Sequence, residues 1–207
     1  MRFTPFVLAL ALSAPAAAYG DAPNPADDPE VARLLQAKST VRWTHVPAGR
    51  SERYGHAETL TEATPERVRQ VASDYAHLKD LHKKFASARI VDKQGDDVDV
   101  YMKLPVRVGP FTVDQWEVLR FGPPKSVGNT YVVEGRGVRG NMKSGHVVIT
   151  VRPVDARHSL IKVDILLVPG MPAPQSMVDE ELRDAALDLA NGLKDKAQGW
   201  VGPVQSL

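Results

Sequence analysis

Three glycines in the segment EGRGVRG have the spacing of a dinucleotide-binding loop. Gly135, Gly137 and Gly140 form a G-x-G-x-x-G pattern, with Arg136 and Arg139 between them. Such a loop binds a pyrophosphate where a strand leads into a helix whose N-terminus faces the anion. The residues that follow form a turn and then another strand-like run, so no helix N-terminus is available. We therefore expect the glycines to mark a bend or a close backbone approach within a strand.

The histidines and serines show no catalytic or metal-binding spacing. His77 and His82 are the closest pair of histidines, but at five residues apart on a helix they do not share a face. The chain has no cysteine and no HExxH motif, so we expect no metal site and no cofactor. Ser144 stands two residues before His146, but the G-x-S-x-G elbow of a serine hydrolase is missing.

Acid–base chemistry stays open, because scattered polar residues can serve it without a sequence motif. Trp116, Tyr131 and Asp164 are the candidates for such a role. The alternative is that the two aromatic residues belong to the core and direct their polar atoms to a partner. Asp164 alternates outward on its strand, away from the expected core.

The first 18 residues have the organisation of a secretory signal peptide. Met1-Arg2 is a short basic start, an apolar run extends over residues 6–12, and Ala16-Ala17-Ala18 is a small-residue cleavage site. We expect cleavage after Ala18 and a periplasmic or secreted mature protein. The apolar run is too short to span a bilayer. A retained N-terminal anchor is the alternative.

The charge of the mature chain argues against a nucleic-acid partner. Removal of Arg2 lowers the basic count from 26 to 25, which equals the 25 acidic residues, whereas nucleic-acid binding calls for a basic surface. Without cysteine the protein depends on a buried core, and its length is sufficient for one. We expect a flexible leader with a short helix over residues 19–38 and one monomeric domain over residues 39–202.

Hydrophobic periodicity predicts a helix followed by an antiparallel meander. Thr64 and Pro65 are the expected cap and first residue of the helix. Apolar residues then alternate along successive runs that are joined by short turns without helices. The expected strands cover residues 98–106, 112–121, 130–135, 145–154 and 159–168, and an earlier strand pair covers residues 40–46 and 54–60.

The chain closes with a long amphipathic helix. The segment 169–174, rich in proline and glycine, ends the last strand, and a helical pattern follows from Ser176 for about five turns. The apolar face of this helix includes several alanines. These small side chains either leave room for a ligand or let the helix lie close to the sheet.

This order of elements resembles START-like proteins, the SRPBCC superfamily, and within it the polyketide-cyclase and coenzyme Q-binding subgroup. The segment ATPERVRQVASDYAHLKDL resembles the first helix of that superfamily. The segments VDVYMKLPV, GPFTVDQWEVL and SGHVVITV resemble its successive strands, and LLVPGMPAPQSMVDEELRDAALDL resembles its passage into the closing helix. The resemblance covers about residues 50–200. It implies an α+β helix-grip fold, in which a curved antiparallel sheet wraps the C-terminal helix around a tunnel for an apolar ligand.

The resemblance implies that the protein binds, and carries across the periplasm, a lipid or other hydrophobic small molecule. A cyclase- or dehydratase-like enzyme that acts on an apolar substrate is the first alternative, and an adaptor that binds proteins through the outer sheet face is the second. At the rim we expect Arg136, Arg139 and Lys143, which would meet an anionic headgroup or a membrane transiently; a solvated hairpin is the alternative. The residues expected to line the tunnel are Met102, Leu104, Trp116, Met142, Ile149, Leu182, Ala186, Leu189 and Leu193.

Overall fold

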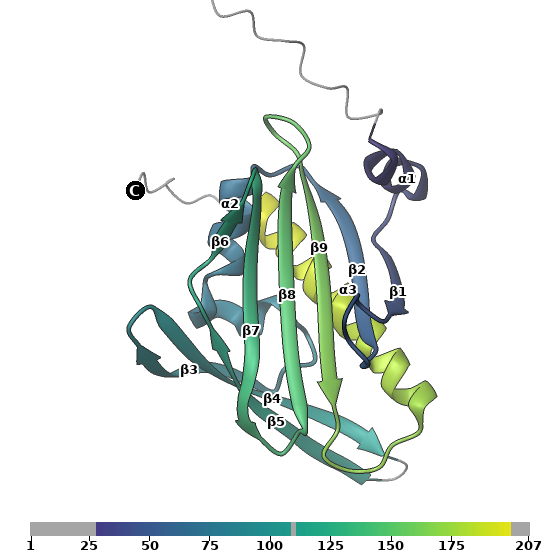
Figure 1. Ribbon diagram of the computed structural model, residues 1–207, viewed down its shortest axis with the longest axis vertical. Helices are drawn as coiled ribbons and strands as arrows, with labels where there is room; N and C mark the ends of the chain where they lie inside the picture. The colour runs from purple at the N-terminus through teal and green to yellow at the C-terminus, as the bar shows by residue number, and fades with distance from the viewer. Residues whose placement is uncertain (1–27, 109–110, 200–207) are drawn as a thin grey trace, which may run out of the picture.

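The computed structural model describes residues 28–108 and 111–199. The expected signal peptide, residues 19–27 of the expected leader and the expected domain end at residues 200–202 lie outside this part. The described residues form a nine-stranded antiparallel sheet that curves around a long C-terminal helix (Figure 1). The predicted α+β helix-grip fold is therefore confirmed.

Each of the first two helices begins at a capping side chain. The Asp28 carboxylate accepts hydrogen bonds from two backbone N–H groups at the start of α1 (Pro29–Ala37). Thr64 caps α2 (Pro65–Ala72) by accepting from the Arg67 N–H, as predicted. A short 3-10 helix, η2 (Tyr75–Leu81), follows α2, and α3 (Gln175–Gly199) closes the described chain.

The strands form a meander, and the N-terminal hairpin of β1 and β2 extends the sheet by pairing with the last strand, β9. The order in the sheet is β1-β2-β9-β8-β7-β5-β4-β3, and β6 pairs with β7. The predicted strands are all present, and β3 and the short β6 are additions. The bounds are β1 Val41–His45, β2 Tyr54–Thr61, β3 Ser87–Gln94, β4 Asp97–Val108, β5 Phe111–Phe121, β6 Lys125–Val127, β7 Thr130–Gly140, β8 Ser144–Pro153 and β9 Ser159–Val168.

The sheet changes direction between β7 and β5, where the three glycines lie. Strands β7, β8 and β9 run side by side, whereas β4 and β5 cross below them (Figure 1). The register between β5 and β7 shifts at Val118/Leu119. A Cβ atom on Gly135 would lie 2.6 Å from the Phe121 ring, and one on Gly140 would lie 2.5 Å from the Trp116 carbonyl oxygen. The expected bend and close approach are both confirmed.

Helix α3 packs on the concave inner face of the sheet at unusually short range. A Cβ atom on Gly55 of β2 would overlap the Leu182 carbonyl oxygen, and one on Gly192 would overlap that of Leu81 in η2. Ala186 and Ala190 are fully buried at the same interface. Small residues thus allow the backbones to approach.

Within the described residues, no helix has both the length and the apolar character required to cross a membrane.

Helix α1 contacts the opposite, outer side of the sheet. Val31 and Leu34 are buried there. Around them, Asp28 forms an ion pair with Arg152, Glu30 with Lys162, and Arg33 with Glu58. The outer side at β2, β8 and β9 is therefore covered by a small apolar contact with ionic surroundings, separate from the core around α3.

Candidate functional site

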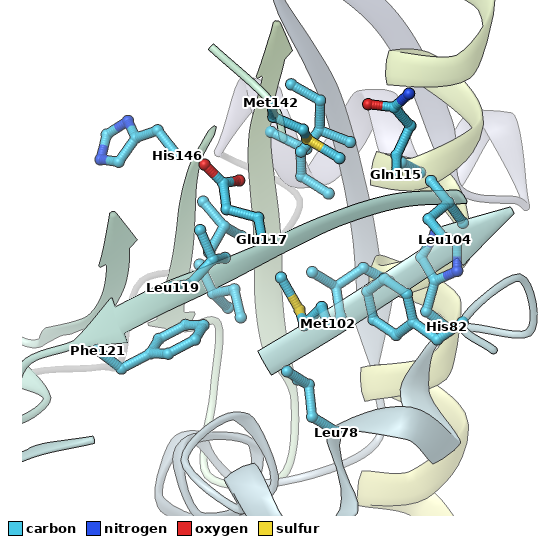
Figure 2. Close-up of a pocket in the computed structure, with 17 residues that line it drawn as sticks. Leu78, His82, Met102, Leu104, Gln115, Glu117, Leu119, Phe121, Met142 and His146 are labelled. Atoms are coloured by element: carbon cyan, nitrogen blue, oxygen red, sulfur yellow. The ribbon is translucent and has the colours of Figure 1, made fainter. Parts of the chain in front are cut away.

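An apolar cavity lies between the inner face of the sheet and α3 (Figure 2). About 60 Å³ is open in it to the centres of water molecules, and an adjoining cavity offers about 70 Å³. Leu104, Gln115, Met142 and Leu167 line both. The other residues around the first cavity are Leu78, His82, Phe85, Met102, Glu117, Leu119, Phe121, His146, Val147, Ile149, Ile165, Ala185 and Leu189.

The size of the two cavities implies that a large ligand must widen them. One water molecule needs about 10–15 Å³ measured in this way, so each cavity accommodates only a few water molecules. Met102 and Met142 lie on the wall of the first cavity, and Met171 and Met177 on that of the second. Methionine side chains are flexible and adapt to irregular shapes. These walls can therefore change shape more readily than walls of branched residues.

Glu117 is an acidic side chain in this apolar wall. It projects inward from β5 (Figure 2) and is 4% exposed. Its Oε2 atom has no hydrogen-bond partner among the described residues. Burial raises the pKa of its carboxyl group to about 7. The carboxylate lies against the backbone of Gly137 and Gly145, where a Cβ atom would overlap it.

Gln115 and His82 are two other polar residues of this wall. Gln115 is 8% exposed; its Nε2 lies 3.9 Å from the sulfur of Met171, while its buried Oε1 has no partner in the described part of the chain. The ring of His82 stacks on Phe85 and its Nδ1 accepts a hydrogen bond from the Lys84 N–H. Burial lowers the pKa of His82, so the ring is neutral at pH 7 with its proton on Nε2.

The structure brings most of the expected lining residues to these cavities. Met102, Leu104, Met142, Ile149 and Leu189 border the first, and Leu182 borders the second. Ala186 and Leu193 lie elsewhere on α3, fully buried in the core and outside both linings. These two side chains therefore pack closely in the core, and neither of them leaves space for a ligand.

The position expected for Trp116 is wrong. Gln115 and Glu117 occupy the inward positions of β5, so Trp116 points to the outer face, where its ring lies 5.8 Å from that of Tyr101. The prediction followed the size and apolar character of tryptophan instead of the strict alternation of a strand. Every second residue of this strand, counted back from the apolar Phe121 and Leu119, gives Glu117 and Gln115 as the other inward positions.

The expected rim also needs correction. Arg136 lies on the outer face and forms an ion pair with Glu134 at 2.6 Å. Arg139 pairs in register with Val118 of β5 and is exposed. The glycines next to these arginines, Gly135, Gly137 and Gly140, lie against Phe121, Glu117 and the Trp116 backbone of β5. Arg136 and Arg139 therefore point outward. Lys143, in the β7–β8 turn, borders a hollow beside the second cavity and is the one expected rim residue near an opening.

A second polar cluster lies on the outer face, at the junction of β1, β2 and β9. His45 Nε2 and His56 Nδ1 each lie 2.7 Å from Asp164 Oδ1, and His56 Nε2 lies 3.0 Å from Glu58 Oε1. Burial opposes the charge of His56, but its hydrogen bonds to Asp164 and Glu58 outweigh burial and raise its pKa to about 9.

This cluster also has the spacing of metal ligands. The candidate ligand atoms of His45, His56 and Asp164 lie within 4.8 Å of one another. Hydrogen bonds of a protonated His56 account for the short nitrogen–oxygen distances without an ion. The sequence did not indicate this group, because its members are brought together by the pairing of β2 with both β1 and β9.

Solved structures with the same architecture come from lipid-transfer and cyclase proteins. A STAR-related lipid transfer protein from Xanthomonas axonopodis superposes with a TM-score of 0.62 at 15% identity, over 77% of this chain and 94% of its own. The human StAR-related lipid transfer protein 5 gives 0.62 at 10% identity, over 81% and 91%. The Zhui aromatase/cyclase from Streptomyces sp. R1128 gives 0.52 at 14% identity, over 70% and 92%.

These similarities show that the chain has the fold of the START-like superfamily. No protein-family model matches the sequence, and no curated protein has a significantly similar sequence. The likeness therefore lies in the three-dimensional arrangement. At identities of 10–15% it speaks for the fold alone.

Proposed function

We propose that this protein, which has the START-like fold, binds a lipid or other hydrophobic small molecule between its sheet and α3, and carries it. The observation that supports the proposal best is the apolar cavity at that place, walled by Met102, Leu104, Ile149 and Leu189. Transfer of an apolar ligand from water into such a cavity is favourable by roughly 25 cal/mol per Å² of apolar surface that it buries. Lipid transfer by similarly folded proteins supports the same function.

Native mass spectrometry of the purified protein, followed by organic extraction, tests this function. We expect a bound apolar molecule, or saturable binding of an added one. Ala185→Leu adds bulk to the cavity wall and should weaken that binding at least tenfold. Ala37→Leu, on the exposed end of α1, is the matched control and should bind normally. A protein that binds no apolar molecule, or an Ala185→Leu variant that binds as well as the control, would contradict the proposal.

An enzyme that acts on an apolar substrate is the second candidate, and Glu117 is the observation that favours it. A buried carboxyl group with a pKa of about 7 is suited to donate or accept a proton near neutral pH. The similarly folded aromatase/cyclase supports this reading. Turnover of a bound polyketide-like substrate, abolished by Glu117→Gln, would establish the enzyme. Recovery of every bound molecule unchanged would support the carrier.

We further propose that the protein is exported and cleaved after Ala18, as the basic start and the small-residue site of the first 18 residues suggest. Expression of the full chain in a Gram-negative host tests this. The expected result is a periplasmic protein whose intact mass corresponds to a chain beginning at Tyr19. A full-length protein in the cytoplasm or in the membrane fraction would rule the proposal out.

A further inference from the structure

Two oxygen atoms in the cavity wall are hydrogen-bond acceptors without a donor. They are Glu117 Oε2 and Gln115 Oε1, both buried and both without a partner among the described residues. A buried polar group left in this state is unfavourable, and more so when it is charged. Both residues project inward from β5 and line the first cavity (Figure 2).

The surrounding backbone is shaped to hold the Glu117 carboxylate at this place. Gly137 of β7 and Gly145 of β8 both lie where any side chain would collide with its oxygens. The ladder between these strands ends at the pair Arg136 and His146, just before the two glycines. The carboxylate thus lies where the two strands separate, in contact with backbone instead of water.

The charge of the wall selects against an anion. Among the residues that line the first cavity, Glu117 is the sole acid and none is lysine or arginine. Of the two lining histidines, His82 is neutral because burial lowers its pKa. Both ring nitrogens of His146 are already bonded, to the Tyr54 hydroxyl and to Glu134, instead of facing the cavity. A carboxylate or phosphate placed in this cavity would face Glu117 with no cation to offset the repulsion.

We propose that the ligand is an apolar molecule with a hydrogen-bond donor, an alcohol or an amine, which donates to Glu117, and that fatty acids and phosphate groups are excluded from this cavity. This inference rests on the proposed function. It assigns Glu117 as the residue that determines specificity and Gln115 as a second acceptor. The donor removes the cost of the unpaired Glu117 oxygen, and an amine carries further N–H groups that can donate to Gln115 as well. The apolar remainder of the ligand contacts the walls formed by β4, β8 and α3.

Calorimetric titration with four probes of nearly equal size tests the inference. They are 1-octanol, octylamine, octanoate and methyl heptyl ether, measured at pH 8, above the pKa of about 7 at which Glu117 becomes an acceptor only. Since a hydrogen bond to a charged group contributes about 1.5–3 kcal/mol, the alcohol and the amine should bind at least tenfold more tightly than the ether. Octanoate should bind most weakly.

Variants separate this inference from the proposed function. In Glu117→Leu the alcohol and the ether should bind within twofold of each other. In the nearly isosteric Glu117→Gln, the alcohol should stay within threefold of wild type, whereas the amine should lose at least tenfold. Glu62→Gln, on an exposed position, should change nothing. Equal binding of alcohol, ether and octanoate in wild type would overturn the inference and leave the proposed function standing. If no probe binds and extraction yields no ligand, both are overturned.

Discussion

The Glu117 side chain makes the interior of this protein sensitive to pH. Its environment disfavours the ionised form, because burial removes the carboxylate from water without supplying a donor. The folded state therefore holds a proton that the unfolded chain, with an ordinary carboxyl pKa of 4.5, has already released. Between these two pKa values, each rise in pH favours the unfolded state.

We expect the free energy of unfolding to fall by up to about 3 kcal/mol as the pH rises from 4.5 to above 7, since the pKa of Glu117 moves from 4.5 to about 7 on folding. Glu117→Gln removes the titrating group and should remove this part of the pH dependence, so the variant is the more stable protein at pH 8. Urea denaturation at several pH values measures this. If the free energy of unfolding changes equally with pH in wild type and variant, the carboxylate has a partner or water in solution and the assignment is contradicted.

In His56 the folded environment favours the charged form, whereas in Glu117 it favours the neutral form. The reason is that the carboxylates of Asp164 and Glu58 neighbour the His56 ring. Its folded pKa of about 9 exceeds the unfolded value of 6.5, so its contribution is complete below pH 6.5 and is lost as the pH rises through 9. We expect His56→Gln to cost up to about 3 kcal/mol at pH 6 and little at pH 9.5. The exposed His77→Gln serves as the control. Denaturation curves at the two pH values decide; a cost for His56→Gln that does not change with pH would contradict the assignment.

At the scale of single elements, strand β7 shows how the sheet acquires its shape. The glycines of β7 leave room for side chains of β5: Gly135 lies against Phe121, and Gly137 lies against Glu117. The bulge at Val118/Leu119 increases the local twist where β5 turns away from β7. The bend that creates the cavity and the position of the acid within it thus depend on the same few residues.

A double-mutant cycle tests this dependence. Gly137→Val should destabilise the protein by about 1–3 kcal/mol, as overpacking of a close contact does, because the new side chain collides with the Glu117 carboxylate. In a Glu117→Ala background the cost should fall substantially, since the colliding atoms are absent. Gly122→Ala, whose Cβ would lie an ordinary 3.6 Å from Asp97, is the control. Additive effects of Gly137→Val and Glu117→Ala would show that the contact is not what requires glycine.

The same elements show what could be predicted from the sequence. Strand alternation predicted the meander, the Thr64 cap predicted the start of α2, and helical periodicity predicted the closing helix, which begins at Gln175, one residue before the expected start; these signals are local. The pairing of β2 with β9 is long-range, so the sequence offered Asp164 as a candidate but did not indicate that it lies beside His45 and His56. Glu117 was missed for a different reason: a charged residue in an apolar cavity departs from the hydrophobic pattern that defines a core. Such departures are expected at functional sites.

At the scale of the whole molecule, the sheet separates two apolar contacts with different roles. Its inner face and α3 enclose the cavity, while its outer face carries α1, fixed by Val31 and Leu34 and by ion pairs. The inner contact contains space and flexible methionines. None of the described residues of α1 borders either cavity. Stability and ligand binding should therefore respond to different substitutions.

Adjacent leucines in α1 test this separation. Leu34 is 2% exposed and Leu35 is 53% exposed. Leu34→Ala should lower the free energy of unfolding by about 2–4 kcal/mol, the usual cost of emptying a buried leucine site, whereas Leu35→Ala should change it by less than about 0.5 kcal/mol. Both variants should bind an apolar ligand as wild type does, because α1 lies across the sheet from the cavity. Denaturation and calorimetric titration on the same samples measure both quantities. A loss of affinity in Leu34→Ala, measured where the variant is fully folded, would show that the two faces of the sheet are coupled.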